Sequence, residues 1–208
     1  MATTAAPYGL RPINLIGGQQ FAGSTRQIAI ASGQTTNIFY GDIVAIDATT
    51  GTIEKVTATG TDGTTNALPA GVVGVFLGCT YTDPTLKYKL NAQYWPSGTV
   101  ASDAMAYVCD DPDTLFQVAV VSGTTVVTGV QFTSVGNNAT IVDNASSTVS
   151  GDSQLALTDS TATTDTLPIR IVDVVPDTAY TSGGNTLYPE VIVKFNFGMH
   201  AYETAVGV

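Results

Sequence analysis

The sequence contains very few of the side chains on which enzyme chemistry usually depends. It has one histidine, two cysteines, and seven lysine and arginine residues in a chain of 208. Acid–base catalysis relies mostly on histidine and perturbed carboxylates, and metal sites rely on clustered histidine, cysteine or acidic residues. His200 has only Glu203 close to it in the sequence, and no serine or cysteine stands in a nucleophile-elbow motif. We therefore expect no enzyme, no catalytic residue and no cofactor.

Positive charge is also scarce, because 17 acidic residues outnumber the seven basic ones and give a net charge of −10. Proteins that bind nucleic acids or anionic membranes usually concentrate lysine and arginine on one surface. The sequence therefore predicts neither a nucleic-acid partner nor a membrane partner. It has no run of about 18 apolar residues, and its first residues do not resemble a signal peptide. We expect synthesis in the cytoplasm.

The two cysteines, Cys79 and Cys109, each lie in an apolar stretch. A pair at this spacing is not a disulfide framework, and no cysteine–histidine spacing indicates zinc. We expect both to be buried free thiols, and a single bridge between them is the alternative.

The acidic residues Asp110, Asp111 and Asp113 are the best candidate for a metal site, since closely spaced carboxylates suit calcium. However, Pro112 interrupts the calcium-loop pattern, and no glycine follows at the required position. We therefore interpret this segment as a turn between two strands, and we expect no metal site.

The residues that are abundant favour a β-structure. Hydrophobic residues make up 44% of the chain and charged residues only 12%, about half of the usual share. Short apolar runs bounded by turn residues predict a mainly β fold, with a β-barrel or β-sandwich body formed by residues 26–121 and 166–208. The run Ala70–Tyr81 fits a strand buried on both faces or a bulged barrel strand. A weakly charged surface favours packing inside an assembly.

Two segments differ from this body. Residues 1–25 carry apolar side chains between prolines and glycines without a helical or strand period, which predicts an extended arm lying on its own body or on a neighbour. Residues 122–165 are rich in Thr, Gly, Ser and Asn, which predicts a β-rich insertion or second lobe that faces solvent. Within that segment, Ser153–Asp159 is the one stretch that could form a short helix.

Surface chemistry leaves two questions open. Tyr88, Tyr94 and Trp95 could form a sugar-stacking platform, although core or interface aromatics are commoner. Arg11 and Arg26, in or beside the arm, could pair with acidic groups on a partner or be ordinary surface arginines.

Several stretches resemble small structural proteins of tailed phages, of the marine and freshwater type that includes cyanophages. The resemblance covers most of residues 5–120 and the region of Asn196, and it is carried by the ranges Ala6–Gly18, Ile38–Val44, Gly74–Thr82, Gln93–Gly98 and Tyr107–Asp113. It implies a head decoration, or cement, protein that binds the outer capsid surface as a homotrimer or homodimer. The implied partner is the major capsid protein, which the cement protein would stabilise by bridging neighbouring subunits.

With this resemblance, we expect the arm to contact the capsid. The expected contact residues are Tyr8, Leu10, Arg11, Pro12, Ile13, Leu15 and Phe21. Two alternatives stay open, namely another virion component such as a tail or adaptor protein, and a carbohydrate-binding module that uses the aromatic cluster.

Overall fold

The structure is a computed structural model, and it describes residues 7–57, 71–121, 132–165, 167–178 and 189–196. These residues form twelve strands and one short 3₁₀ turn. In chain order they are β1 (Arg11–Leu15), β2 (Arg26–Ala29), β3 (Ile43–Ile46), β4 (Ile53–Lys55), β5 (Val72–Thr82), β6 (Lys89–Ala92), β7 (Met105–Cys109), β8 (Thr114–Val121), η1 (Phe132–Ser134), β9 (Asn138–Asn144), β10 (Gln154–Ala162), β11 (Ile169–Val174) and β12 (Glu190–Phe195). The predicted mainly β fold is therefore confirmed.

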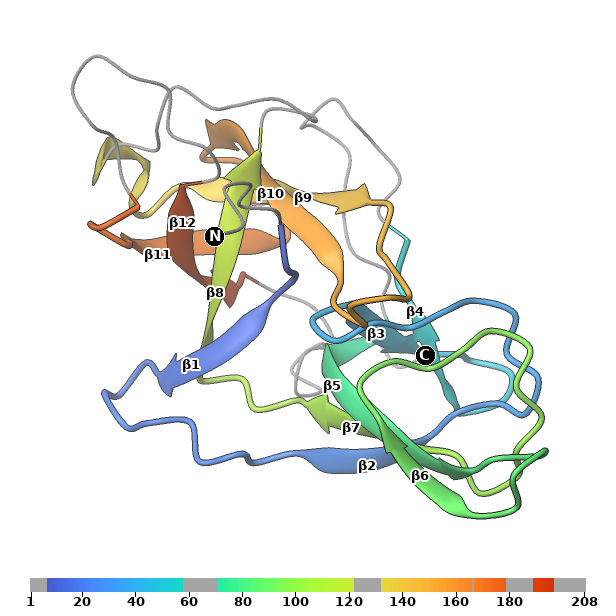
Figure 1. Cartoon of the computed structure of the whole chain (residues 1–208). Helices are drawn as coiled ribbons and strands as arrows, with labels where there is room; N and C mark the ends of the chain where they lie inside the picture. Colours follow the sequence, from blue (N-terminus) through green and yellow to red (C-terminus); the bar gives the residue numbers. More distant parts are fainter. Residues whose placement is uncertain (1–6, 58–70, 122–131, 166, 179–188, 197–208) are drawn as a thin grey trace.

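The first sheet closes into a five-stranded barrel in the order β8-β10-β9-β11-β12 (Figure 1). Closure depends on β8, which pairs with β12 and also, at its end, with β10 in a parallel pair. The first half of β8 also pairs with β1, so Phe116 and Gln117 pair with both β1 and β12. Along β8 the alternate side chains Phe116, Val118 and Val120 enter the barrel core, as the two-residue period of a strand requires.

The second sheet has the order β2-β7-β5-β3-β4, with β6 beside the end of β5. Its strands β3 and β5 are buried on both faces. On β3, Ile43 joins the barrel core while the next residue, Val44, joins a second core on the opposite face. On β5, Val75 and Phe76 divide between the two cores in the same way. The second sheet therefore serves as a shared wall, and the expectation that Ala70–Tyr81 holds a strand buried on both faces is confirmed.

Two glycines shape β5. Gly78 has φ +126° and lies where the register with β7 shifts between Phe76 and Cys79, which makes β5 a bulged strand. At Gly74, an added Cβ would lie only 2.0 Å from the backbone oxygen of Cys109. Glycine is therefore needed at position 74 for the close approach of β5 and β7.

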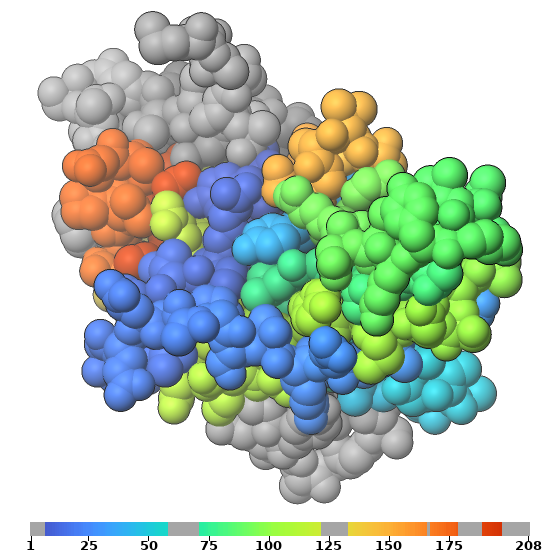
Figure 2. All heavy atoms as spheres, turned by 60° about the horizontal axis from the view of Figure 1, so that its bottom comes forward, coloured from blue at the N-terminus to red at the C-terminus, as the bar shows by residue number. Residues whose placement is uncertain are grey.

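The N-terminal segment differs from the expectation of an arm without regular structure. Arg11–Leu15 form strand β1, and Leu10 is completely buried in the barrel core. Pro12 is tolerated because β1 is at the end of the sheet and its register shifts just after the proline. In Figure 2 this blue segment lies against the rest of the molecule. Its described part, residues 7–25, therefore lies on its own body; residues 1–6 lie outside the described ranges.

Residues 122–165 were expected to form an insertion or second lobe. Their described part instead supplies β9 and β10, two of the five barrel strands, and Ile141, Leu155 and Leu157 are buried in the barrel core. The stretch Ser153–Asp159, which could have formed a short helix, belongs mostly to β10 instead. Residues 122–131 fall outside the description.

Among the described residues, no helix has the length and apolar character needed to cross a membrane.

The two cysteines are free and buried, as expected. Cys79 belongs to the second core and Cys109 to the barrel core. The two thiols therefore lie on opposite faces of the second sheet. Burial raises the pKa of the Cys79 thiol to about 12, and burial also raises the pKa of Cys109.

Both thiols are predicted to resist alkylation in the native protein and to react fully after unfolding. The physical reason is that alkylation needs an accessible thiolate, which burial disfavours. Mass spectrometry after iodoacetamide treatment without reductant, with and without denaturant, measures this. A two-dalton mass deficit with no labelling in denaturant would show a disulfide bridge and contradict the prediction.

Candidate functional site: the seam between the two sheets

Three segments that lead into β1, β3 and β10 meet where the barrel joins the second sheet. We call this region the seam, and it comprises residues 8–11, 39–42 and 151–153. The backbone N–H of Leu10 donates to the oxygen of Gly41 at 3.0 Å, and that of Ser153 donates to the oxygen of Tyr40 at 2.9 Å. These bonds tie segments together that are distant in the sequence.

Two glycines allow this contact. Gly9 and Gly41 have φ values of +79° and +91°. A Cβ on Gly9 would lie 2.8 Å from the oxygen of Gly41, and a Cβ on Gly41 would lie 3.0 Å from the Cα of Gly9. Since both the conformation and the space exclude a side chain, the seam requires glycine at both positions.

A buried carboxylate lies at the centre of the seam. Asp42 is 0% exposed. Its two oxygens accept hydrogen bonds from the backbone N–H of Phe39 at 2.8 Å and from the hydroxyl of Ser153 at 2.6 Å. The ammonium group of Lys55 lies 3.3 Å from Asp42 and 3.0 Å from Asp143. The three groups that contact Asp42, from Phe39, Ser153 and Lys55, are all donors, which is the environment that an ionised carboxylate needs.

The pKa of Asp42 is raised above its usual value. The largest cause is burial, which disfavours the charged form, and Asp143 acts in the same direction. The ammonium of Lys55 and the hydrogen bonds from Ser153 and Phe39 lower the pKa but do not cancel the burial. The charged state of Asp42 therefore depends on Lys55.

A second polar cluster covers the outer side of the seam. The guanidinium group of Arg11 lies 4.6 Å from the ring centre of Tyr8 and 6.0 Å from that of Tyr40. It also lies 3.4 Å from a carboxylate oxygen of Asp152, which accepts a hydrogen bond from the amide of Gln93 at 2.7 Å. Arg11 thus joins the N-terminal segment to both neighbouring segments through cation–π and ionic contacts.

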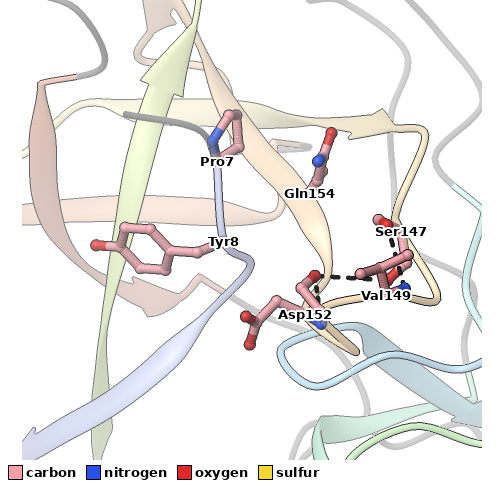
Figure 3. Close-up of a pocket in the computed structure, with 7 residues that line it drawn as sticks. Pro7, Tyr8, Ser147, Val149, Asp152 and Gln154 are labelled. Carbon is pink, nitrogen blue, oxygen red and sulfur yellow. Dashed lines mark hydrogen bonds between the residues drawn. The ribbon is translucent and has the colours of Figure 1, made fainter. Parts of the chain in front are cut away.

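Beside this cluster lies an open pocket of about 440 Å³. Its walls combine apolar, hydroxyl, amide and carboxylate groups, from Pro7, Tyr8, Ser147, Val149, Ser150, Asp152 and Gln154. In Figure 3, Pro7 and Tyr8 stand on one side and Ser147 and Val149 on the other, with Asp152 between them. The pocket is open to solvent.

The titratable groups with raised pKa values do not favour nucleophilic chemistry. Burial, followed by the neighbouring Glu190, raises the pKa of the Tyr8 hydroxyl, and burial raises that of Tyr40. Phenols and thiols with raised pKa values stay protonated at neutral pH and are weak nucleophiles. Within the described ranges, no group of three or more histidine, cysteine or acidic side chains is placed to hold a metal ion. His200 lies outside the described residues.

The seven residues that the sequence assigned to capsid contact do not form one free surface. Tyr8 and Arg11 belong to the seam cluster, Phe21 packs against the barrel core, and Pro12, Ile13 and Leu15 lie in β1. The predicted capsid contact is wrong for Leu10, because this side chain is completely buried in the chain's own core and has no surface to offer a partner.

The acidic segment after β7 is a turn, as predicted. The carboxylate of Asp111 accepts the backbone N–H of Asp113 at 2.9 Å, a local bond that holds the turn. Asp110 pairs with Arg26 at 2.7 Å, and Asp113 pairs with Lys194 at 3.4 Å. Arg26 therefore has an acidic partner within its own chain.

The aromatic cluster does not form a sugar-binding platform. Trp95 is completely buried and packs edge-on against Tyr81, with ring centres 5.1 Å apart. Tyr94 stacks on Phe39, whereas Tyr88 is half-exposed elsewhere. The core interpretation is confirmed for Trp95, and a carbohydrate module that stacks sugars on Trp95 is excluded by its burial.

Comparisons with protein-family models, curated protein sequences and solved structures give no match to this chain.

Replacing Lys55 by methionine is predicted to lower the free energy of unfolding by about 3 kcal/mol at neutral pH, because it leaves a buried charge unpaired. The deficit relative to the parent should shrink as the pH falls. Because the pKa of Asp42 is raised in the folded state, the cost of burying its charge is absent below the unfolded pKa, grows as the pH rises from the unfolded to the folded pKa, and is complete above the folded pKa. Urea unfolding at a series of pH values measures both effects.

The matched control is Lys194→Met, which removes an ion pair at the surface. It should cost less than about 1 kcal/mol. A Lys55→Met deficit that is equally large at acid and neutral pH would contradict the role given to Asp42.

Proposed function

We propose that this chain is a virion structural protein of a tailed phage, a decoration or cement protein that binds the outer head shell and bridges major capsid protein subunits. The phage assignment rests on the sequence resemblance described above. The structural support is a rigid β-body that presents apolar side chains at several separate loops. Such a body suits a protein that joins neighbouring subunits, because a bridge needs contact points in more than one place.

The observation that carries this proposal is the set of large apolar side chains left exposed. Ile16 follows β1 and is 54% exposed, while Val149 lies between β9 and β10 and is 95% exposed. Apolar groups at loop ends add nothing to the chain's own core, and they gain free energy when a partner covers them.

The N-terminal segment keeps a part in the proposed contact, but as a folded element. Ile16 and the outer sides of Arg11 and Ile13 could face a capsid subunit, whereas Leu10 cannot. Deleting residues 1–25 would remove β1 and Leu10 from the body, so deletion is a poor test of binding. Ile16→Glu is a better variant, because this side chain already faces solvent.

The energetic requirement on each contact is modest. Packaged DNA loads the shell outward, and a clamp across a subunit seam raises the free energy of opening. Because many copies act on one shell, each needs to contribute only a few kcal/mol. A tail or adaptor protein would act in few copies, so copy number separates the two assignments.

Heads of the encoding phage that lack this protein are predicted to assemble and package DNA, but to lose it at lower temperature or after osmotic shock. Purified protein should restore resistance, with binding that saturates at a fixed number set by the shell's symmetry. Binding should weaken only mildly with salt, since seven basic residues cannot make a mainly electrostatic interface. DNA release on heating and quantitative electrophoresis of purified heads measure these effects.

The Ile16→Glu variant tests the contact directly. The surface control is Val135→Glu, because Val135 follows η1, is only 39% exposed and is not assigned to the contact. Heads that are equally robust with and without the protein would exclude the cement role. A copy number of only a few per virion would favour the tail or adaptor assignment.

A further inference from the structure

We propose that the end of the β5–β6 hairpin docks on the acidic surface of a second copy of this chain. We call this region the hairpin tip, and it comprises residues 83–89 with Val100 beside them. The proposal goes beyond shell binding and does not depend on it. It rests on three observations that coincide at this one place.

The first observation is exposed apolar surface. Leu86, Tyr88 and Val100 are 57%, 52% and 66% exposed. Val100 lines a hollow of about 210 Å³ together with Pro84 and Lys87, which brings the two loops together. This end of the second sheet lies in the green region on the right of Figure 2. Several exposed apolar groups at one place mark a contact surface, whereas a single one does not.

The second observation is unpaired positive charge. Five of the seven basic residues have a carboxylate or amide partner within the chain, namely Arg11, Arg26, Lys55, Arg170 and Lys194. Lys87 and Lys89 form no ion pair with any residue that the structure describes. Both of these lysines lie in the hairpin tip, on either side of Tyr88.

The carboxylates nearest to these lysines are already engaged. Asp83 accepts the backbone N–H groups of Thr85 and Leu86, both at 2.7 Å. Asp103 accepts the backbone N–H and the hydroxyl of Thr82, and the charge of Lys89 acts on it from a longer distance. These hydrogen bonds come from neutral groups and leave the carboxylate charges in place, but no ion pair joins Asp83 or Asp103 to Lys87 or Lys89, so both ammonium groups stay available to an anionic partner.

The third observation is backbone conformation. Lys87 has φ +59°, and it is the one residue other than glycine with a positive φ in the described part of the chain, where ten glycines take such values. The left-handed conformation is strained for a residue that carries a side chain. A lysine that occupies a position better suited to glycine is consistent with a use for its ammonium group.

A second copy supplies the surface that this tip requires. The chain carries a net charge of −10, so two copies repel each other over most of their surfaces. The hairpin tip is where exposed ammonium and apolar groups occur together. Its approach to the acidic surface of another copy replaces repulsion with attraction and covers Leu86 and Tyr88. Charge complementarity therefore favours a contact between unlike surfaces of two copies.

The full chain should self-associate with rising concentration in sedimentation experiments at low salt. The double variant Leu86→Ser with Tyr88→Ser should weaken association about tenfold or more, as removing buried anchors does. Lys87→Gly should weaken association while leaving the melting temperature unchanged or higher, because glycine relieves the backbone cost. Lys194→Gln is the matched control: it removes one positive charge outside the tip and should leave association nearly unchanged.

Carbodiimide cross-linking identifies the contact directly. In a mixture of ¹⁴N- and ¹⁵N-labelled chains, it should join Lys87 or Lys89 of one copy to an aspartate or glutamate of the other. A chain that sediments as a monomer at every concentration, or mixed-isotope cross-links that never include these lysines, would overturn the proposal. Equal weakening by Lys194→Gln would also overturn it, because it would show an effect of net charge alone.

Discussion

The structure depends most on keeping a carboxylate ionised where no water reaches it. Asp42 lies at 0% exposure, and transferring a charge to such a place costs several kcal/mol unless donors replace the lost hydration. Its donors come from different parts of the chain: the Phe39 backbone, the Ser153 hydroxyl before β10, and the Lys55 ammonium at the end of β4. If any of these segments moved away, a buried charge would be left uncompensated. The barrel and the second sheet are therefore held in one relative position, and the glycine contact and Arg11 reinforce it from outside.

The small number of basic residues also determines which charged groups remain on the surface. A chain with seven basic residues uses five of them in contacts within itself, and several of those contacts join the N-terminal segment or the barrel to neighbouring strands. Most basic side chains therefore stabilise the fold of the chain itself. The groups left exposed include apolar side chains in loops and two lysines at the hairpin tip, which are the groups that the two proposed contacts use.

Sequence reasoning succeeded where the deciding interaction is local and failed where it is not. The strand within Ala70–Tyr81, the buried thiols and the Asp110–Asp113 turn all follow from neighbouring residues, and all three were predicted. Strand β1 was missed because Pro12 and the surrounding glycines conceal a pairing with β8, a hundred residues later. Strands β9 and β10 were assigned to a separate lobe because their polar connections dominate the composition of 122–165. The seam was missed because its contacts join residues that are distant in the sequence. Asp42 has the sequence of a Gly-Asp turn, and nothing near it in the sequence indicates contacts with Lys55 or Ser153, or the nearby charge of Asp143.

The shared wall has a consequence for the order in which the molecule can form. All strands of the second sheet lie within residues 26–109, whereas the barrel cannot close before β12, Glu190–Phe195, is available. During synthesis from the N-terminus, the second core can therefore assemble while the other face of its sheet still lacks a cover. In that interval Ile43, Val75 and Cys109 face solvent, although Cys79 is already enclosed. The two thiols, equally inert in the finished protein, thus become protected at different times, and the later one marks the moment at which the barrel closes.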